Sequence, residues 1–141
     1  MLKKRCGEDD LPKFIEQVEK ELGSSAFVIW LQAEMGAGKT FFVRQFLRQR
    51  GLSESMPVVS PTYTIMNEYK IDQDWYAHLD LYRAEEDFSL DELGVQDRSY
   101  HGVFLEWPEA PSESQQIKPT HILKIDYDDD FDFRNYSFEQ I

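Results

Sequence analysis

The sequence predicts an α/β fold of the doubly wound type, in which helices cover both faces of a mostly parallel sheet. Residues 26–31 are almost all apolar, as is typical of a parallel strand that is buried on both faces. Apolar residues recur at helical spacing before this run, at 11–22, and after it, at 41–49. A buried strand between two helical segments is the repeating unit of such a fold.

The first helix is predicted to begin at Leu11 and to end before Gly23. Asp9 and Asp10 offer an acidic N-cap, and Pro12 suits the first turn, where no backbone N–H is needed. Gly23 is a natural helix stop. One face of the helix is apolar and consists of Leu11, Phe14, Ile15, Val18 and Leu22.

The segment after the buried strand has the composition of a phosphate-binding loop, or P-loop. Its residues are Gly36-Ala37-Gly38-Lys39-Thr40, and Gly51 closes the helix that follows. Glycines let backbone N–H groups approach an anion, the lysine reaches the β- and γ-phosphates, and the threonine hydroxyl can hold Mg²⁺. Ala33 replaces the first glycine of the usual pattern, and we expect it to end the strand with a negative φ. These features predict a P-loop NTPase-like fold.

Two hairpins and a further buried strand are predicted downstream. Strands at 64–69 and 75–81 flank an Asp72-Gln73-Asp74 turn. Residues 103–107 form a buried strand that Pro108 ends. The predicted C-terminal antiparallel hairpin has strands at 120–127 and 131–138.

Two shorter elements are also predicted. Residues 58–63 suggest a short strand interrupted by Pro61, and Ser89-Leu90-Asp91-Glu92 has the form of a capping box that begins a short helix.

Length and composition favour one globular domain spanning residues 1–141. Hydrophobic residues make up 41% of the chain, which argues against disorder. The 15 Lys and Arg against 27 Asp and Glu give a formal net charge of −12, so direct nucleic-acid binding is disfavoured and a basic protein partner is expected. The N-terminus lacks a signal-peptide core, apolar runs are too short for a membrane span, and a single cysteine fits a reducing compartment; we expect a cytoplasmic protein.

An anionic nucleotide needs a local group of cations on such an acidic chain. Lys39 and the start of its helix are the nearest positive groups in the sequence. We expect Arg44, Arg48 and Arg50, farther along the same helix, to contribute as well.

Three polar residues are candidates for the chemistry. Asp80 ends an apolar strand, where it either faces a metal ion held by the P-loop or faces solvent. Glu106 lies in a buried strand, where it is either a metal or water-activating group or a structural carboxylate with a partner. Thr62, after Ser60-Pro61, is either a hydroxyl that senses the γ-phosphate or an ordinary turn residue.

Other polar and aromatic residues carry less information. Arg83 can bind a phosphate or a carboxylate, and Trp107 is expected in the core. His78, His101 and His121 are scattered without a second ligand at metal spacing, so no catalytic or metal-binding role is expected for them.

Six motifs follow one another along the chain: Gly36-Ala37-Gly38-Lys39-Thr40, Ser60-Pro61-Thr62-Tyr63-Thr64, Asn67-Glu68-Tyr69, His78-Leu79-Asp80-Leu81-Tyr82-Arg83, Asp91-Glu92-Leu93-Gly94 and Glu106-Trp107-Pro108-Glu109. In this order they resemble the bacterial TsaE family, the small ATPase of tRNA threonylcarbamoyladenosine biosynthesis. The resemblance covers residues 8–127, whereas residues 128–141 match nothing specific. The family tends to have a threonine near the nucleotide before the first helix; Gly7-Glu8-Asp9-Asp10 stand there, and no nucleotide contact is assigned to them.

The resemblance implies Mg²⁺-ATP binding and slow ATP hydrolysis by the isolated protein. It implies action with two sugar-kinase-like protein subunits, which hold the tRNA and transfer the threonylcarbamoyl group to an adenosine. The small ATPase would reset that complex between turnovers and meet tRNA only indirectly.

Carried onto this sequence, the resemblance also implies roles for single residues. It implies Mg²⁺ ligation by Thr40 and Glu106, a metal-facing or catalytic acid at Asp80, and a switch-like hydroxyl at Thr62. Lys39 would act on the phosphates in catalysis. The implied nucleotide-binding residues are Glu34, Met35, Gly36, Ala37, Gly38, Lys39, Thr40 and Phe41.

Two other functions stay open on sequence grounds. A small-molecule kinase would need a second substrate pocket and usually an arginine-rich lid, and no basic segment of that kind follows Arg50. A regulatory module that binds nucleotide without hydrolysing it would share the P-loop.

Overall fold

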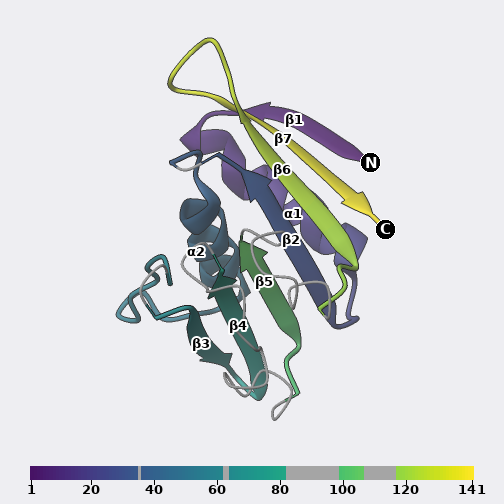
Figure 1. The fold of residues 1–141 in the computed structure, drawn as a ribbon, viewed down its shortest axis with the longest axis vertical. Helices are drawn as coiled ribbons and strands as arrows, with labels where there is room; N and C mark the ends of the chain where they lie inside the picture. Colours follow the sequence, from purple (N-terminus) through teal and green to yellow (C-terminus); the bar gives the residue numbers. More distant parts are fainter. Residues whose placement is uncertain (35, 62–63, 82–98, 107–116) are drawn as a thin grey trace.

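The computed structural model describes residues 1–34, 36–61, 64–81, 99–106 and 117–141. In these ranges seven strands form one sheet in the order β1-β7-β6-β2-β5-β4-β3, and two α-helices lie together on one face (Figure 1). The elements are β1 Leu2–Cys6, the 3₁₀ turn Glu8–Asp10, α1 Leu11–Leu22, β2 Phe27–Ala33, α2 Lys39–Arg50, β3 Met66–Ile71, β4 Asp74–Asp80, β5 Gly102–Glu106, β6 His121–Tyr127 and β7 Arg134–Gln140.

The centre of the sheet is parallel and its edges are antiparallel. β2 lies between β5 and β6 and is parallel to both, and β4 is parallel to β5. β3, β7 and β1 add antiparallel strands outside this core. The predicted P-loop NTPase-like α/β class is confirmed, and β6 and β7 form the predicted C-terminal hairpin. The carboxyl ends of β2, β4 and β5 therefore meet at one end of the sheet.

The two helices bury their apolar sides against the same face of the sheet, so the helices predicted on both faces are not found within the described ranges. α1 begins and ends where predicted, and Gly23 follows it with a φ of 62°. The main core joins both helices to β2, β5, β6 and β7. Burial of a large aliphatic or aromatic side chain of this kind contributes roughly 1.5–3 kcal/mol. The buried helical residues are Leu11, Phe14, Ile15, Val18 and Leu22 in α1 and Lys39, Phe42, Val43, Phe46 and Leu47 in α2.

The opposite face of the sheet carries a second apolar cluster. Side chains of a strand point alternately to the two faces. In β4, Ala77 and Leu79 belong to this second cluster, whereas Tyr76 belongs to the core under the helices. The same alternation in β5 places Val103 and Leu105 in the second cluster and directs the remaining side chains toward the helices.

Two differences from the predicted elements have local causes. β1 was not predicted, because Lys3, Lys4 and Arg5 give it a strongly basic composition that only an edge strand accommodates. The strand predicted at 58–63 is wrong over its described part, 58–61, which is irregular. The Val58 carbonyl accepts a hydrogen bond from the Arg44 side chain and not from the backbone of a neighbouring strand. Proline at position 61 has no N–H to donate to such a strand.

Two strands begin at least two residues later than predicted, and one predicted helix lies outside the described residues. β3 begins at Met66, because Ile65 has a φ of 69°. β7 begins at Arg134, because the Asp130 carboxylate accepts the Asp132 N–H and extends the turn. The short helix predicted near Ser89 falls outside the described ranges. Neither α-helix of the described ranges is both long and apolar enough to span a membrane.

Gly102 provides a test of the packing between β2 and β5. Its cross-strand neighbour is Phe27, whose ring packs against Phe46 and Phe104. A Cβ atom on Gly102 would meet the Phe27 Cζ atom at 2.3 Å. We expect Gly102→Ala to lower the free energy of unfolding by about 1–3 kcal/mol, measured by urea denaturation. In a Phe27→Leu background the same change should cost less, because leucine leaves room; an equal cost in both backgrounds would contradict this account.

Candidate functional site

The candidate site begins with two carboxylates at the end of the parallel core. Asp80 is the last residue of β4 and Glu106 the last of β5, and the two are direct partners in the strand register. Both are buried, each with 3% of its surface exposed. Strand alternation turns both toward the face that carries α2, because Tyr76 and Phe104 on the same strands belong to the core beneath the helices. Buried carboxylates at such a position need a cation or donors.

The P-loop connects the end of β2 to the start of α2. Gly36 and Gly38 have φ values of 79° and 110°, a left-handed conformation that favours glycine. The Ala37 N–H donates to the Glu34 carbonyl at 3.1 Å, which closes a turn inside the loop. Ala33 has the predicted negative φ, because Ile65 and Asp72 are the non-glycine residues with a positive φ within the described ranges. Alanine therefore fits the first position of the loop without backbone strain.

Lys39 is the buried cation of the site. It is the first residue of α2, and its Nζ donates to the Ala33 carbonyl at 2.9 Å. Burial lowers the pKa of the Lys39 ammonium, and the nearby negative charges of Glu106 and Asp80 oppose that shift. The loop thus holds its lysine folded back on its own first carbonyl, close to both carboxylates. An incoming phosphate would compete with that carbonyl for the ammonium group.

Asp80 is also attached to the segment that precedes β3. The Ser60 hydroxyl donates to Asp80 Oδ2 at 3.4 Å, and the Asp80 N–H donates to the Ile65 carbonyl at 2.8 Å. Ile65 is β-branched and has a positive φ, a conformation that costs roughly 1–3 kcal/mol. Ser60 and Ile65 are therefore both joined to Asp80 by hydrogen bonds. Thr62 belongs to this segment but lies outside the described residues.

Glu106 has a buried partner for which the sequence predicted no role. His78 is fully buried in β4, and its Nε2 forms a short hydrogen bond with Glu106 Oε2. The sequence does hold a signal for His78: it lies two residues before Asp80, and residues i and i+2 of a strand share a face. His78 could therefore have been predicted to lie on the same face as Asp80. His101 and His121 have no comparable contact with Asp80, Glu106 or Lys39 among the described interactions.

The three arginines expected to offset a nucleotide's charge have other partners. Arg44 donates to the Val58 carbonyl, and Arg48 donates to the Ser53 and Met56 carbonyls at 2.6 Å each. Arg50 lies at the far end of α2, where it binds the Glu19 carboxylate and the Tyr76 hydroxyl. Arg50 is paired with a carboxylate and ties α2 to α1, so the expectation is wrong for Arg50. Arg44 and Arg48 fasten residues 53–58 to α2 through neutral carbonyls and keep their charge, so their contribution to nucleotide binding stays a prediction.

A cleft of about 700 Å³ lies beside the P-loop. Its walls include Gly36–Gly38 and Phe41 from the loop and α2, residues 7–10 from the N-terminal turn, and residues 131–134 with Tyr136 from the C-terminal hairpin. Neither the N-terminal nor the C-terminal wall was expected to take part in binding. A space of this size next to a phosphate-binding loop suits the nucleoside part of a nucleotide.

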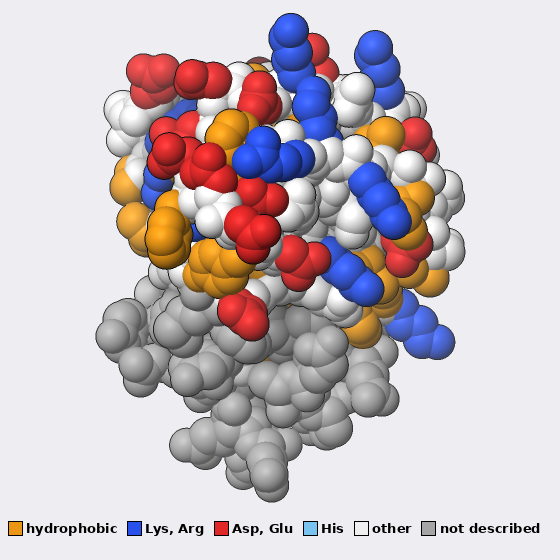
Figure 2. Space-filling view, turned by 90° about the horizontal axis from the view of Figure 1, so that it is seen from above, with side chains coloured by type: hydrophobic (Ala, Val, Ile, Leu, Met, Phe, Trp, Pro, Cys, Tyr) orange, Lys and Arg blue, Asp and Glu red, His pale blue; other side chains and the backbone are white. Residues whose placement is uncertain are grey.

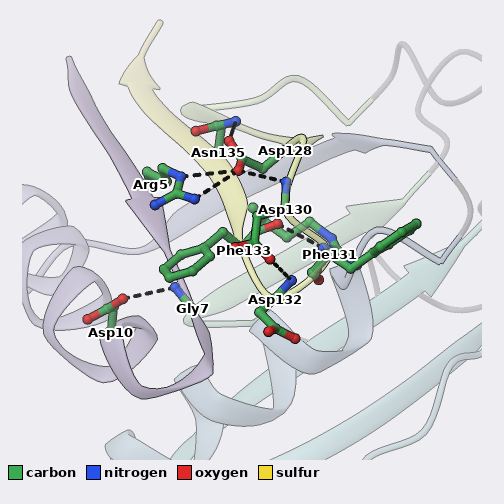
Figure 3. A network of polar contacts seen from close by, with 10 residues as sticks. Arg5, Gly7, Asp10, Asp128, Asp130, Phe131, Asp132, Phe133 and Asn135 are labelled. Atoms are coloured by element: carbon green, nitrogen blue, oxygen red, sulfur yellow. Dashed lines mark hydrogen bonds and ion pairs between the residues drawn. The ribbon is translucent and has the colours of Figure 1, made fainter.

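The wall contributed by the β6–β7 loop is fixed by a network of polar contacts (Figure 3). Arg5 donates to Asp128 Oδ2 at 3.1 Å, and its guanidinium group lies 3.8 Å from the Phe133 ring centroid. Asn135 donates to Asp128 Oδ1 at 3.0 Å. Phe131 points away from these contacts and is 89% exposed. The strand β1 therefore orders a loop from the other end of the sequence.

Charged side chains are separated on this end of the molecule. Figure 2 looks onto the end that bears the β6–β7 loop, and acidic side chains (red) gather in one half of the described surface while most basic ones (blue) lie in the other. A nucleotide at the P-loop would depend on the buried Lys39 and on backbone N–H groups at the start of α2.

The implied metal ligands Thr40, Asp80 and Glu106 are consistent with Mg²⁺. Thr40 is in the first turn of α2, next to Lys39, whose charge couples to both carboxylates. Within the described ranges, no three His, Cys, Asp or Glu side chains are grouped to hold a metal on their own. Mg²⁺ is usually held by one or two carboxylates together with phosphates and waters, so two carboxylates and a hydroxyl fit this ion.

The implied nucleotide-binding residues fall into three groups in the structure. Gly36, Ala37, Gly38 and Phe41 line the cleft, and Lys39 and Thr40 begin α2 beside it. Glu34 is exposed and closes the loop turn through its carbonyl. Met35 lies outside the described residues, as do Arg83 and Trp107.

Comparisons with known proteins agree with this architecture. The model of the family "Threonylcarbamoyl adenosine biosynthesis protein TsaE" matches residues 7–135. Proteins named tRNA threonylcarbamoyladenosine biosynthesis protein TsaE are 34% identical over 122 residues in Haemophilus influenzae (84% of this chain, 74% of that protein) and 39% identical over 117 residues in Aquifex aeolicus (82% and 83%). A crystal structure of Bacillus subtilis YdiB superposes with a TM-score of 0.66 and 25% identity, covering 99% of this chain and 85% of the other.

The contact between Arg5 and Asp128 leads to a prediction about pH. Hydrogen bonds from Arg5, then from Asn135 and the Asp130 N–H, lower the pKa of the Asp128 carboxyl from 3.8 to about 2. Because the folded-state pKa lies below the unfolded one, the contact stabilises the loop fully above 3.8 and is lost as the pH falls toward 2. We expect Arg5→Gln to raise the pKa of Asp128 toward 3.8, measured by NMR titration of its carboxyl carbon.

Lys3→Gln is the matched control for this titration. Lys3 lies two residues earlier on β1, so its replacement removes one positive charge from the same strand. Among the described interactions, the hydrogen bond and ion pair of β1 with Asp128 come from Arg5 and not from Lys3. We expect this variant to leave the pKa of Asp128 near its wild-type value. Equal shifts in both variants would show that general charge, not the hydrogen bond, sets the pKa.

Proposed function

The chain belongs to the TsaE family of threonylcarbamoyl adenosine biosynthesis proteins, and we propose that it is a Mg²⁺-dependent ATPase of that pathway. The proposal includes two sugar-kinase-like protein subunits as partners in the cytoplasm. Those subunits, and not this chain, would hold the tRNA. The net charge of −12 supports this division, because an acidic surface repels nucleic acid and favours basic regions of a protein.

One observation carries the proposal of a nucleotide site. A buried ammonium, Lys39, lies at the end of a glycine-rich loop and couples electrostatically to two buried carboxylates, Asp80 and Glu106. A triphosphate brought to this loop would add several negative charges to a region that already has two. Such a site needs more positive charge than one lysine supplies, and a divalent cation provides it. We therefore propose Mg²⁺ as the cofactor, held by Thr40, Asp80 and Glu106.

The proposed mechanism assigns each step to groups at this end of the sheet. Lys39 exchanges the Ala33 carbonyl for phosphate oxygens, and the N–H groups of the loop and of the first turn of α2 bind the same phosphates. Bound Mg²⁺ would supply charge that stabilises the phosphoryl group during transfer. Glu106 or Asp80 orients the attacking water by accepting its hydrogen bond. The water oxygen bonds the terminal phosphorus, the bond from that phosphorus to the bridging oxygen breaks, and ADP, inorganic phosphate and a proton are released.

The cleft beside the P-loop is the proposed position of the nucleoside. Phe41 and Tyr136 lie in its walls and offer aromatic surface to a base. Thr62 is the proposed nucleotide sensor, because residues 60–65 are joined to Asp80 at both ends by hydrogen bonds. A change at the γ-phosphate would reach this segment through Asp80 and alter the surface offered to the partner subunits.

The first test of this function is phosphate release by a Lys39→Ala variant. Loss of the ammonium should lower Mg²⁺-dependent ATP hydrolysis by about 10²–10³-fold, the usual effect of removing one charge-stabilising group. Lys20→Ala, which changes an exposed lysine in the last turn of α1, should hydrolyse ATP like wild type. Hydrolysis by Lys39→Ala at the wild-type rate would contradict the site.

The same assay distinguishes the other two functions. Nucleotide binding by wild type without phosphate release, alone and with both partner subunits, would indicate a regulatory module. Transfer of phosphate to an added small molecule, measured as phosphorylated product, would indicate a kinase.

The second test concerns the nucleotide sensor. We expect wild type to bind the partner subunits with different affinities in its ATP-bound and ADP-bound states. Thr62→Ala should bind them with the same affinity in both states. Titration calorimetry measures these affinities. Thr64→Ala is the matched control from the same segment: its hydroxyl donates to the Asn67 side chain at 2.9 Å and not to Asp80, so the variant should keep the wild-type difference. A Thr62→Ala protein that keeps this difference would make Thr62 an ordinary turn residue.

A further inference from the structure

We propose that His78 is a positioning residue that holds one oxygen of Glu106, so that the Glu106 carboxylate does not turn to pair directly with Lys39 and stays available to the metal ion. The role of Glu106 as a ligand rests on the proposed function. The role of His78 goes beyond it, because it concerns a residue that would contact neither nucleotide nor metal ion.

The fold brings His78 and Glu106 together on one face of the sheet. They lie on adjacent parallel strands, where His78 is opposite Phe104 and Asp80 is opposite Glu106. Side chains two residues apart on a strand share a face, so His78 and Asp80 both lie on the side of Glu106. The imidazole is fully buried, and its Nε2 meets Glu106 Oε2 in a short hydrogen bond.

The second imidazole nitrogen indicates which group donates this hydrogen bond. Nδ1 of His78 is buried and has no hydrogen-bond partner among the described residues. A hydrogen on Nδ1 would be a buried donor without an acceptor, which costs roughly 1–3 kcal/mol. A bare Nδ1 acceptor is tolerated more readily. The arrangement therefore places a hydrogen on Nε2, so that His78 donates to the Glu106 carboxylate.

The hydrogen bond matters because Lys39 competes for the same carboxylate. Lys39 is buried, and Glu106 is the nearby charge with the largest effect on its ammonium. A Glu106 side chain free to turn would pair with that ammonium and oppose its transfer to a phosphate. His78 fixes Oε2 and leaves the other oxygen, Oε1, for a metal ion or water. Hydrogen bonds of this kind to a ligand carboxylate orient it and strengthen metal binding.

The experiment compares His78→Leu with His78→Gln. Leucine keeps apolar bulk but removes the donor, whereas the glutamine amide can still donate to Glu106. Binding of ADP and of a non-hydrolysable ATP analogue is measured by calorimetry, with Mg²⁺ and with EDTA. We expect His78→Leu to reduce the Mg²⁺-dependent gain in affinity for the analogue by about 10–100-fold, and His78→Gln to restore most of it. Affinity in EDTA should change little in either variant.

His121→Leu is the matched control for the loss of a buried histidine. His121 begins β6 at the opposite end of the sheet, hydrogen-bonds Thr120 and stacks on Phe138 with ring centroids 4.9 Å apart. This variant should lower the melting temperature without altering the Mg²⁺-dependent gain. If His78→Leu does not fold, His78→Asn takes its place, because its shorter side chain brings the amide less close to Glu106.

The outcomes separate the two proposals. If His78→Leu keeps the full Mg²⁺-dependent gain in affinity that wild type shows, the positioning role is overturned and the proposed function stands. Equal losses in His78→Leu and His78→Gln would also overturn the role, because a donor would then not matter. A wild-type protein whose affinity for the analogue shows no Mg²⁺-dependent gain would overturn the proposed function and this inference together.

Discussion

The burial of one ammonium beside two carboxylates is the interaction on which this end of the molecule depends. Burying an isolated charge is strongly unfavourable, so Lys39, Asp80 and Glu106 are acceptable only as a group. Their proximity follows from topology, since three parallel strands, β2, β4 and β5, end at one end of the sheet and turn the same face toward α2. A sheet with the same residues in antiparallel order would not gather them.

The helix that begins at the P-loop is anchored along its whole length. Its first residue bonds the start of the loop, Arg44 and Arg48 hold residues 53–58, and Arg50 joins α1 through Glu19. The Arg50 guanidinium also lies over the rings of Phe27, Phe46 and Tyr76. Contacts far from the loop therefore fix where its N–H groups point. The arginines therefore serve the proposed phosphate site by positioning the helix.

Elements with local signals were predictable, and contacts between distant segments were not. α1 and the strand before the P-loop were evident because spacing, caps and apolar runs lie within a few residues of one another. His78 was overlooked because its partner Glu106 is 28 residues away on another strand. The walls of the cleft escaped prediction for the same reason: residues 7–10 and 131–136 are joined only by the fold. β1 was missed because its partner is β7, at the far end of the chain.

The pairing of β1 with β7 has a consequence for folding. Leu2 lies opposite Phe138, so this pairing joins two strands that are far apart in the sequence. Until the two strands pair, Lys3, Lys4 and Arg5 have no neighbouring strand, and the Asp128 carboxylate lacks the guanidinium that holds it. Contacts of such long sequence separation form slowly. The wall that the β6–β7 loop gives to the cleft therefore depends on a contact that we expect to form late in folding.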